Sequence, residues 1–387
     1  MRYRLLELAG AAAMAVLLLW VPNQAAAQNQ KAPAKKPYSP KRLADGHPDL
    51  QGTYDIATMT PLERPRGAPP AYTPEVAHQR EAAFAKEKQE ADAPIAGDRA
   101  APKPGGETLA PKGSTTGPNA GWWLVATGAG GAVGGYNTGW LDVGSTFTVV
   151  NGESRSSIVV DPPDGRVPPT IPSARQRAAA DYGRPTSDTA ESTDRDLERT
   201  AGAYDDPERR PLGERCLLGF GSTSGPPALP DYFYNNLHQI VQTPTSVMIL
   251  TEMVHDARVV RMNGQHLPKN LRFWMGDSVG HWEGDTLVVD TTNFTNKTRF
   301  HGSTENLHVV ERISRIDDHT LLYRFTVDDP DTWARPWTGE MAWPATDGKI
   351  YEYACHEGNY ALVDVLKGAR TREKEQAAAK AASQGRK

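Results

Sequence analysis

The chain has 387 residues, with 43 Lys and Arg against 47 Asp and Glu, so its formal net charge is −4. This mild acidity excludes the strongly basic character with which nucleic-acid-binding proteins attract phosphate groups. The length exceeds what one small core requires, so two domains or one domain with long insertions both fit it.

The first 27 residues have the three parts of a cleavable secretion signal. Arg2 and Arg4 give a positive start, residues 8–21 are almost continuously apolar, and three alanines precede a predicted cleavage site before Gln28. This apolar run is short for a membrane-spanning helix, which needs about 20 residues, so cleavage is favoured over a retained anchor. We therefore predict a periplasmic or extracellular protein of net charge −5, without stable membrane insertion after cleavage.

The two cysteines, Cys216 and Cys355, both lie after the predicted cleavage site. In an oxidising compartment an even pair is more often bridged than free, which predicts one structural disulfide. Such a bridge closes a loop of about 140 residues, for which chain entropy gives about 4–5 kcal/mol of stabilisation. The alternative is a catalytic or metal-bound thiol, although two thiols alone make an incomplete metal site.

Composition divides the mature chain into segments with different expected structures. Basic, Pro-rich sequence predicts a flexible leader, and Ala, Lys, Glu and Gln dominate the C-terminal tail. The predicted parts are a leader at 28–43, a mainly β domain at 44–370 with a helix near 73–92 and loop excursions at 93–120 and 172–215, and a charged tail at 371–387.

Short β-type runs separated by turn residues fill most of the sequence after Gly121. Asn151-Gly152 lies between two such runs, which is the strongest short-range hairpin signal, and further turns are expected at 244–246, 263–264, 283–285, 317–320 and 346–348. In residues 321–327, apolar and polar side chains alternate as in a half-buried strand. A final helix from Asn359 to Arg370 is expected to lie on the sheet through Leu362, Val363 and Leu366.

Because no helices separate these runs, the predicted sheet is antiparallel. The expected fold is an up-and-down barrel or a sandwich, with a few peripheral helices and long loops.

Several strings resemble those of a family of exported bacterial proteins of unassigned function. They are PDLQGTYD, SSIVVDPPDGRVPP, ERCLLGFGSTSGPP, GHWEGDTLVVDTTNF and YEYACHEGNY. This resemblance spans nearly all of the mature chain and implies a reused domain, but it brings no activity and no catalytic residues. A looser similarity to lipocalin-like barrels rests on the hairpin series and on Gly52-Thr53-Tyr54, where lipocalins carry Gly-x-Trp.

Three polar residues follow the predicted strand at 247–253 and are candidates for acid–base chemistry. His255 beside Asp256 could serve as a general base, and Arg258 could hold a substrate carboxylate or a developing oxyanion. Neighbouring residues on a strand point to opposite faces, so the histidine and the aspartate can pair only if the chain turns there. The alternative is a solvated hairpin loop with a local ion pair.

His356 and Glu357 follow Cys355 at the end of the last predicted strand and are a second candidate acid and base. A bridged Cys355 would fix the position of this turn, as catalytic groups require. The alternative is a simple strand-to-helix turn, with Gly358 supplying a left-handed residue and Asn359 the helix cap.

Glu311 lies in the middle of a predicted strand and shares a face with Val309 and Ile313. A carboxylate on an apolar face is unfavourable unless it is paired or functional. It is therefore either an acid–base group or one half of a structural pair with Arg258, Arg272 or Arg324.

Tryptophans at turns and strand ends are candidate ligand contacts, because an indole at the boundary between apolar and wet surroundings needs a hydrogen-bond partner. The candidates are Trp140, Trp274, Trp282, Trp333 and Trp337. The histidines show no metal-binding spacing, and the glycines at 128–135 lack the context of a dinucleotide loop, so we predict neither a metal nor an organic cofactor.

The sequence thus favours an exported β protein that binds a small amphipathic or aromatic molecule. The alternatives are an acid–base enzyme of the same fold (a lyase, isomerase or hydrolase) and a polysaccharide-binding surface protein.

Overall fold

The computed structural model describes residues 38–91, 142, 144–181, 204–210, 212–218, 225–230, 234–296, 300–358 and 360–384. The predicted signal peptide, most of the leader, the excursion at 93–120 and Trp140 lie outside the described residues. By its internal contacts the chain divides into residues 1–39 and 40–387, and every element named below belongs to the second unit.

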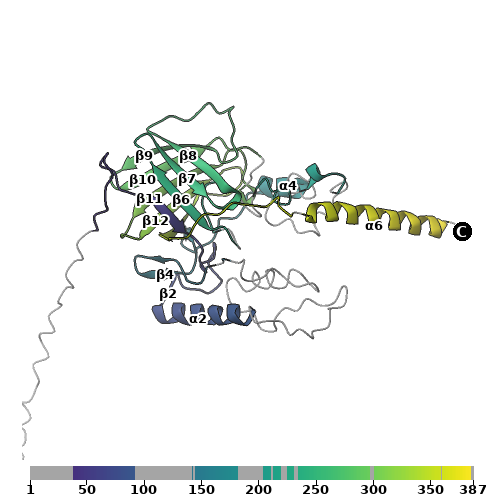
Figure 1. Ribbon diagram of the computed structural model, residues 1–387, viewed down its shortest axis with the longest axis horizontal. Helices are drawn as coiled ribbons and strands as arrows, with labels where there is room; N and C mark the ends of the chain where they lie inside the picture. Colours follow the sequence, from purple (N-terminus) through teal and green to yellow (C-terminus); the bar gives the residue numbers. More distant parts are fainter. Residues whose placement is uncertain are drawn as a thin grey trace, which may run out of the picture. The chain divides into compact units, whose positions relative to one another are not determined.

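A curled ten-stranded sheet forms most of the described structure (Figure 1). Its spatial order is β1-β6-β7-β8-β9-β10-β11-β12-β13-β5. The strands are β1 (Gly52–Asp55), β6 (Leu237–Gln242), β7 (Ser246–Thr251), β8 (Asp256–Met262), β9 (Asp277–Glu283), β10 (Thr286–Thr292), β11 (His308–Arg315), β12 (Thr320–Asp328), β13 (Trp337–Pro344) and β5 (Val159–Asp161). The mainly β prediction is thereby confirmed.

The sheet curls until its first strand meets the end of β13. Tyr54 of β1 forms a bridge with Ala345, and the amide of Thr346 donates to the carbonyl of Thr53 at 2.9 Å. The enclosed face carries the apolar side chains of alternate residues, as in β12, where Leu321, Tyr323, Phe325 and Val327 are fully buried. The main hydrophobic core therefore lies inside the curl.

Gly339 of β13 makes room for one of the largest core side chains. It lies directly opposite Phe325 of β12, and a Cβ added at this glycine would be 2.2 Å from Cζ of the phenylalanine. The Phe325 ring therefore covers the bare backbone of Gly339, and a larger residue would displace it.

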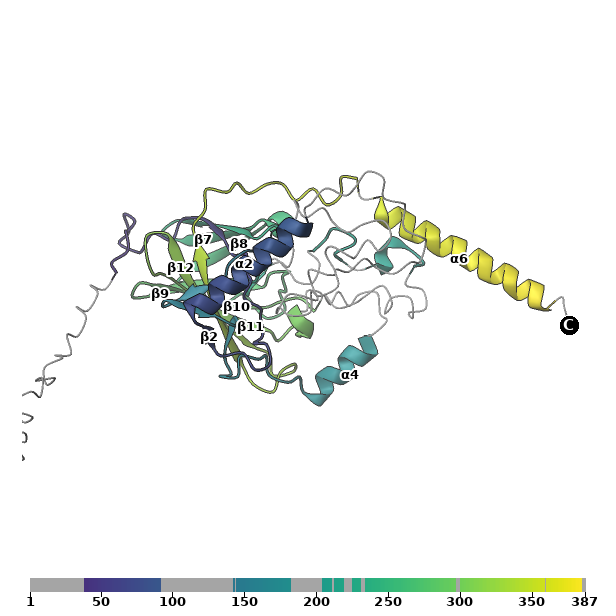
Figure 2. The ribbon, with the colours of Figure 1, turned by 90° about the horizontal axis from the view of Figure 1, so that it is seen from below.

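A small second sheet of β2 (Ala71–Tyr72), β4 (Glu153–Arg155) and β3 (Val149–Val150) packs with helix α2 (Pro74–Ala91), which lies beside β2 and β4 in Figure 1 and is seen from below in Figure 2. Asn151 and Gly152 join β3 to β4 with φ of 54° and 81°, as the predicted hairpin requires. Tyr72, Phe84 and Phe147 belong to a separate apolar cluster between helix and sheet. The amide of Phe147 donates to Glu81 on the helix at 2.9 Å.

The wholly antiparallel prediction is wrong at one place, because β8 and β9 run parallel. Asn263-Gly264 does not close a hairpin. Residues 263–276 instead cross back along the sheet, and we call them the crossover segment. The amide of Phe273 donates to the carbonyl of Asn293, and the Asn293 side chain donates to the carbonyl of Leu267, both at 2.9 Å. These bonds to the end of β10 hold the crossover segment in place.

The strand predicted at 349–354 does not form either. The neighbouring edge of β13 is already paired with β5, and β13 is followed at once by the bridge from Tyr54 to Ala345. Residues 349–354 therefore cannot pair with β13, and Tyr351 is 68% exposed.

The C-terminal helix differs from the prediction in extent and packing. α6 spans Ala361–Gln384, so it includes most of the segment expected to fray, and none of its residues is buried. Val363 is 48% exposed, so the expected contact with the sheet is not made by this residue. Two shorter helices, α4 (Pro172–Asp181) and the single turn η3 (Pro207–Arg209), lie in the predicted excursion at 172–215.

Candidate functional site

A buried ion pair lies inside the curled sheet. Arg258 of β8 donates from Nη1 and Nη2 to the two carboxylate oxygens of Glu311 on β11, at 2.6 and 2.8 Å. The two side chains are 6% and 0% exposed. Of the partners predicted for Glu311, the structure therefore selects Arg258.

Tyr323 of β12 completes the coordination of this carboxylate. Its hydroxyl donates to Oε1 of Glu311 at 2.8 Å and accepts from the amide of Ala228, also at 2.8 Å. Burial, reinforced by the charge of Glu311, raises the pKa of Tyr323 well above its usual value, so the phenol stays protonated. Both oxygens of Glu311 thus accept at least one hydrogen bond.

The same polar group extends to neighbouring strands. Arg258 also donates to the Ser278 hydroxyl at 3.3 Å, and that hydroxyl bonds to Thr291 of β10 at 2.8 Å. All of these side chains are buried and satisfied, so this arrangement is a structural network rather than one poised for proton transfer.

His238 of β6 and Trp343 of β13 form a second, less complete polar arrangement in the same interior. Their ring centroids are 5.2 Å apart, and Trp343 also stacks on Tyr323 at 4.4 Å. His238 is 1% and Trp343 0% exposed. We call these two side chains the His238–Trp343 pair.

Two polar atoms of this pair have no partner among the described residues. The Trp343 indole nitrogen is buried without an acceptor. His238 makes one side-chain hydrogen bond there, between Nδ1 and the carbonyl of Asn236 at 3.3 Å, which leaves Nε2 unpaired. Burial, with a smaller effect of the Arg258 charge, lowers the pKa of His238 to about 4, so the ring is neutral at pH 7.

The hydrogen bond to Asn236 fixes the tautomer of the neutral ring. A backbone carbonyl only accepts, so Nδ1 carries the proton and Nε2 presents a lone pair. The His238–Trp343 pair therefore carries one acceptor and one donor that no described residue satisfies.

A third unpaired buried atom lies six residues along the same strand. The indole nitrogen of Trp337, 0% exposed, has no hydrogen-bond partner in the described structure. Trp337 is surrounded by Phe300, Phe325 and Trp333, with ring centroids 5.7–6.2 Å from its own. Buried indole N–H groups usually find an acceptor, so two unpaired ones inside one sheet are unusual.

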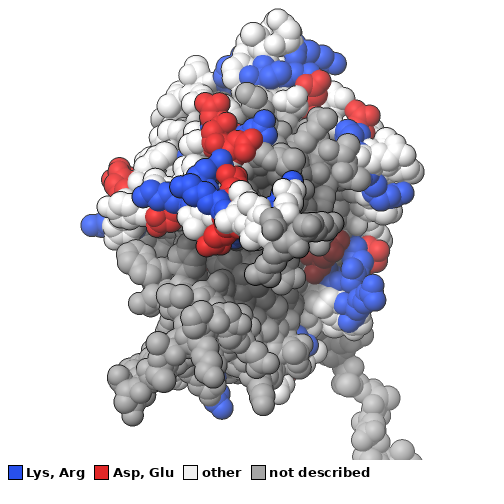
Figure 3. Space-filling view, turned by 90° about the vertical axis from the view of Figure 1, so that its right-hand side faces the viewer, with Lys and Arg blue, Asp and Glu red and all other residues white. Residues whose placement is uncertain are grey.

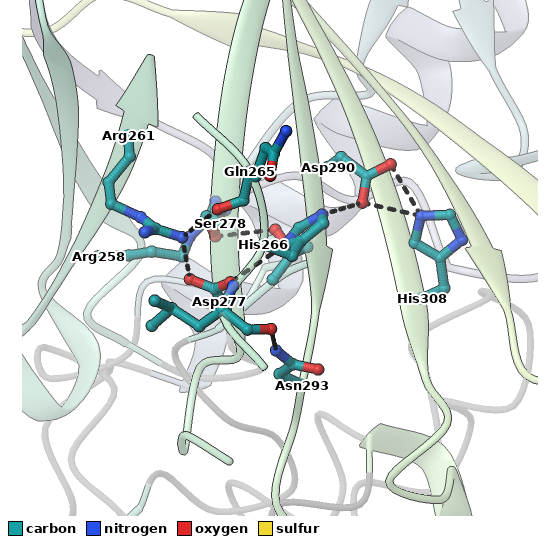
Figure 4. A network of polar contacts seen from close by, with 11 residues as sticks. Arg258, Arg261, Gln265, His266, Asp277, Ser278, Asp290, Asn293 and His308 are labelled. Atoms are coloured by element: carbon teal, nitrogen blue, oxygen red, sulfur yellow. Dashed lines mark hydrogen bonds and ion pairs between the residues drawn. The ribbon is translucent and has the colours of Figure 1, made fainter. Parts of the chain in front are cut away.

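On the opposite face of the sheet, histidines and carboxylates form a chain, drawn in Figure 4. His266 of the crossover segment contacts Asp277 through Nδ1 at 3.2 Å and Asp290 through Nε2 at 3.0 Å. His308 contacts Asp290 at 3.0 Å from the other side. Arg261 donates to Asp277 at 2.7 Å. We call His266, Asp277, Asp290 and His308 the histidine–carboxylate chain.

The contacts within the histidine–carboxylate chain favour the charged forms of Asp290 and His308. The hydrogen bond to Asp290 raises the pKa of His308. Burial alone would raise the pKa of Asp290, but its hydrogen bonds and ion pairs with His308 and His266 lower it. Because both nitrogens of His266 contact carboxylates, this ring ties the crossover segment to β9 and β10.

The structure separates the residues predicted for acid–base chemistry. The chain does turn at His255, whose φ is 58°, but the side chain is exposed, whereas Arg258 points inward to Glu311. Asp256, the first residue of β8, is half-buried.

The second predicted acid–base group lies elsewhere. His356 and Glu357 are exposed beside the Cys355–Cys216 disulfide, whose Cα atoms are 5.7 Å apart. The predicted disulfide is confirmed.

The predicted tryptophans occupy three different environments. Trp333 and Trp337 are core residues, 3% and 0% exposed. Trp274 lies in the crossover segment and is 43% exposed. Trp282 is half-buried and stacks on His47 at 4.8 Å. Their predicted role in ligand binding stays a prediction.

Within the described ranges, no three His, Cys, Asp or Glu residues are grouped so that they could hold a metal ion. Nor does any helix in that part of the chain have the length and apolarity to cross a membrane. On the face drawn in Figure 3, basic and acidic side chains of the described residues are interspersed, as expected for a net charge of −4.

Sequence reasoning missed His238, Trp343 and Tyr323 as members of a site. His238 is the one ionisable residue in its strand, so the local sequence does not indicate a site. Its contact with Trp343 joins residues 105 positions apart. The one available signal was a histidine at an inward position of an alternating strand.

Comparison with known proteins yields no match to a family model, to a curated protein or to a solved structure. The function is therefore inferred from the sequence and geometry of this chain alone.

Proposed function

We propose that this protein binds a small amphipathic or aromatic molecule inside its curled sheet, at the His238–Trp343 pair. The observation that carries the proposal is the buried Trp343 indole N–H, which has no acceptor in the described structure. Leaving such a donor unpaired costs about 1–3 kcal/mol, so an acceptor supplied from outside the chain would be held firmly. Use of the interior in this way is lipocalin-like.

The surroundings of the pair support an aromatic ligand. Tyr54 lies 6.4 Å and Tyr323 4.4 Å from Trp343, measured between ring centroids, so the indole lies among aromatic side chains, which an aromatic ligand would match in chemistry. Ligand binding also agrees better than acid–base catalysis with the buried network of Arg258, Glu311 and Tyr323. Glu311 is fully engaged by Arg258 and Tyr323, and His255 and His356 lie exposed on separate segments.

We also propose that the protein is exported. The Cys216–Cys355 disulfide is compatible with an oxidising compartment, and the N-terminal sequence has the pattern of a cleavable signal.

Native mass spectrometry of the protein as isolated, compared with Trp343→Phe, tests the binding proposal. The expected result is a small-molecule adduct that is lost on denaturation and greatly reduced in the variant, because phenylalanine cannot donate. Trp274→Phe is the matched control, since Trp274 is exposed in the crossover segment and should leave the adduct unchanged. An adduct that depends on Trp274 and survives Trp343→Phe would place the ligand elsewhere and contradict the proposal.

A further inference from the structure

The His238–Trp343 pair presents unlike hydrogen-bonding atoms. Nε2 of His238 is an acceptor because Nδ1 is engaged by the carbonyl of Asn236, and Nε1 of Trp343 is a donor. The group that satisfies both must accept one hydrogen bond and donate another. A hydroxyl group does this with a single oxygen atom.

Charged groups fit this environment poorly. A carboxylate only accepts, so it would satisfy the indole but face the lone pair of His238. An ammonium group only donates, so it would leave the indole unpaired, and it would also lie in the same interior as the Arg258 guanidinium, which already lowers the pKa of His238. The buried carboxylate of Glu311 is already neutralised by Arg258. Burying an uncompensated charge here is strongly unfavourable.

Two neighbouring tyrosine hydroxyls of this interior do not serve the pair. The Tyr54 hydroxyl donates to the carbonyl of Leu50 at 2.8 Å and accepts from Arg315 at 2.8 Å. The Tyr323 hydroxyl is shared between Glu311 and Ala228. The two nearest phenols are thus committed to other partners.

We propose that the ligand of the His238–Trp343 pair is a neutral hydroxylated aromatic molecule, a phenol, whose hydroxyl donates to His238 and accepts from Trp343. This inference rests on the proposed function and narrows it to one chemical class. The low pKa of His238 supports it, since the acceptor persists at every pH above about 4.

Ligand-observed fluorine NMR with four probes of matched shape tests this inference. The probes are para-fluorophenol, para-fluorotoluene, para-fluorobenzoate and para-fluorobenzylammonium. We expect saturable binding of the phenol, with the toluene at least about tenfold weaker because it leaves both buried atoms unpaired, and no saturable binding of either ion. In Trp343→Phe and His238→Leu, the preference for the phenol over the toluene should disappear.

Trp333→Phe controls for damage to the aromatic core, since Trp333 is buried beside Trp337 and makes no ring contact with the pair. This variant should keep the preference for the phenol. Equal binding of the phenol and the toluene to the wild type would overturn the inference and leave the proposed function intact, with a water molecule satisfying the pair. Failure of all four probes to bind would contradict both.

Discussion

At the scale of single residues, the fully buried carboxylate of Glu311 has its charge balanced by one guanidinium, that of Arg258. Glu311→Gln leaves Arg258 buried without a counter-charge, and breaking such a pair costs about 3–5 kcal/mol. We therefore expect a loss of this size in the free energy of unfolding, measured by urea denaturation.

Glu283→Gln is the matched control for this substitution. Glu283 bonds to Arg312 in a similar carboxylate–guanidinium pair, but the two side chains are 48% and 41% exposed. Water replaces the lost partner there, so no resolvable change in stability is expected. Equal effects of the two substitutions would show that the interior pair is not insulated from solvent.

The lowered pKa of His238 predicts that the free energy of unfolding depends on pH. Its pKa in the folded protein, about 4, lies below the unfolded value of 6.5, so the unfolded chain binds the proton more tightly. Stability from the neutral ring is therefore present above pH 6.5 and is lost as the pH falls toward 4. Between pH 7 and 5 the expected loss is about 2 kcal/mol.

Denaturation midpoints across this range, in wild type and in His238→Gln, measure the effect. The variant has no group that titrates at this position, so its curve should be flatter between pH 4 and 6.5. Parallel curves would mean that His238 is protonated as readily in the folded state as in the unfolded state.

At the scale of elements, Gly339 decides whether β12 and β13 can pack. Gly339→Ala places a methyl group 2.2 Å from the Phe325 ring, and overpacking of this kind costs about 1–3 kcal/mol. Thermal unfolding should show the loss. Adding Phe325→Leu should reduce the penalty of the alanine, because the smaller side chain vacates the space. Additive effects of the two substitutions would exclude this contact as the cause.

Strands that a local sequence pattern specifies were predictable from the sequence. Strand pairing that depends on residues far apart in the chain was not. Alternation in residues 321–327 and the turn at Asn151-Gly152 specify β12 and the β3–β4 hairpin within a few residues. The parallel pairing of β8 and β9 depends on contacts of the crossover segment with Asn293, and such contacts leave no periodic signal. Residues 349–354 have strand composition but find their neighbouring edge occupied.

The candidate site was likewise predictable from the sequence only in part. Glu311 was identified because a carboxylate on an apolar face is conspicuous, but the sequence left its partner open among Arg258, Arg272 and Arg324. The pairing of β8 with β9, of β9 with β10 and of β10 with β11 brings the two residues to one interior. His238 and Trp343 are brought together by the curl of the whole sheet.

For the whole molecule, the disulfide is a covalent link between the segment at 212–218 and the segment after β13. The bridged residues are 139 positions apart, for which chain entropy gives about 4–5 kcal/mol. Replacing both cysteines by serine should lower the free energy of unfolding by an amount of this order, measured in urea without reductant. Titratable thiols in the denatured wild type, or equal stability of the variant, would contradict this role.

The central claim is that Trp343 donates to a bound hydroxyl group, and the most direct measurement is the NMR signal of its indole N–H during titration with para-fluorophenol. The signal is assigned by its absence in Trp343→Phe. We predict a saturable downfield shift of this signal, while that of the exposed Trp274 stays unchanged. A Trp343 signal that does not move at saturating phenol, or a shift confined to Trp274, would contradict the account.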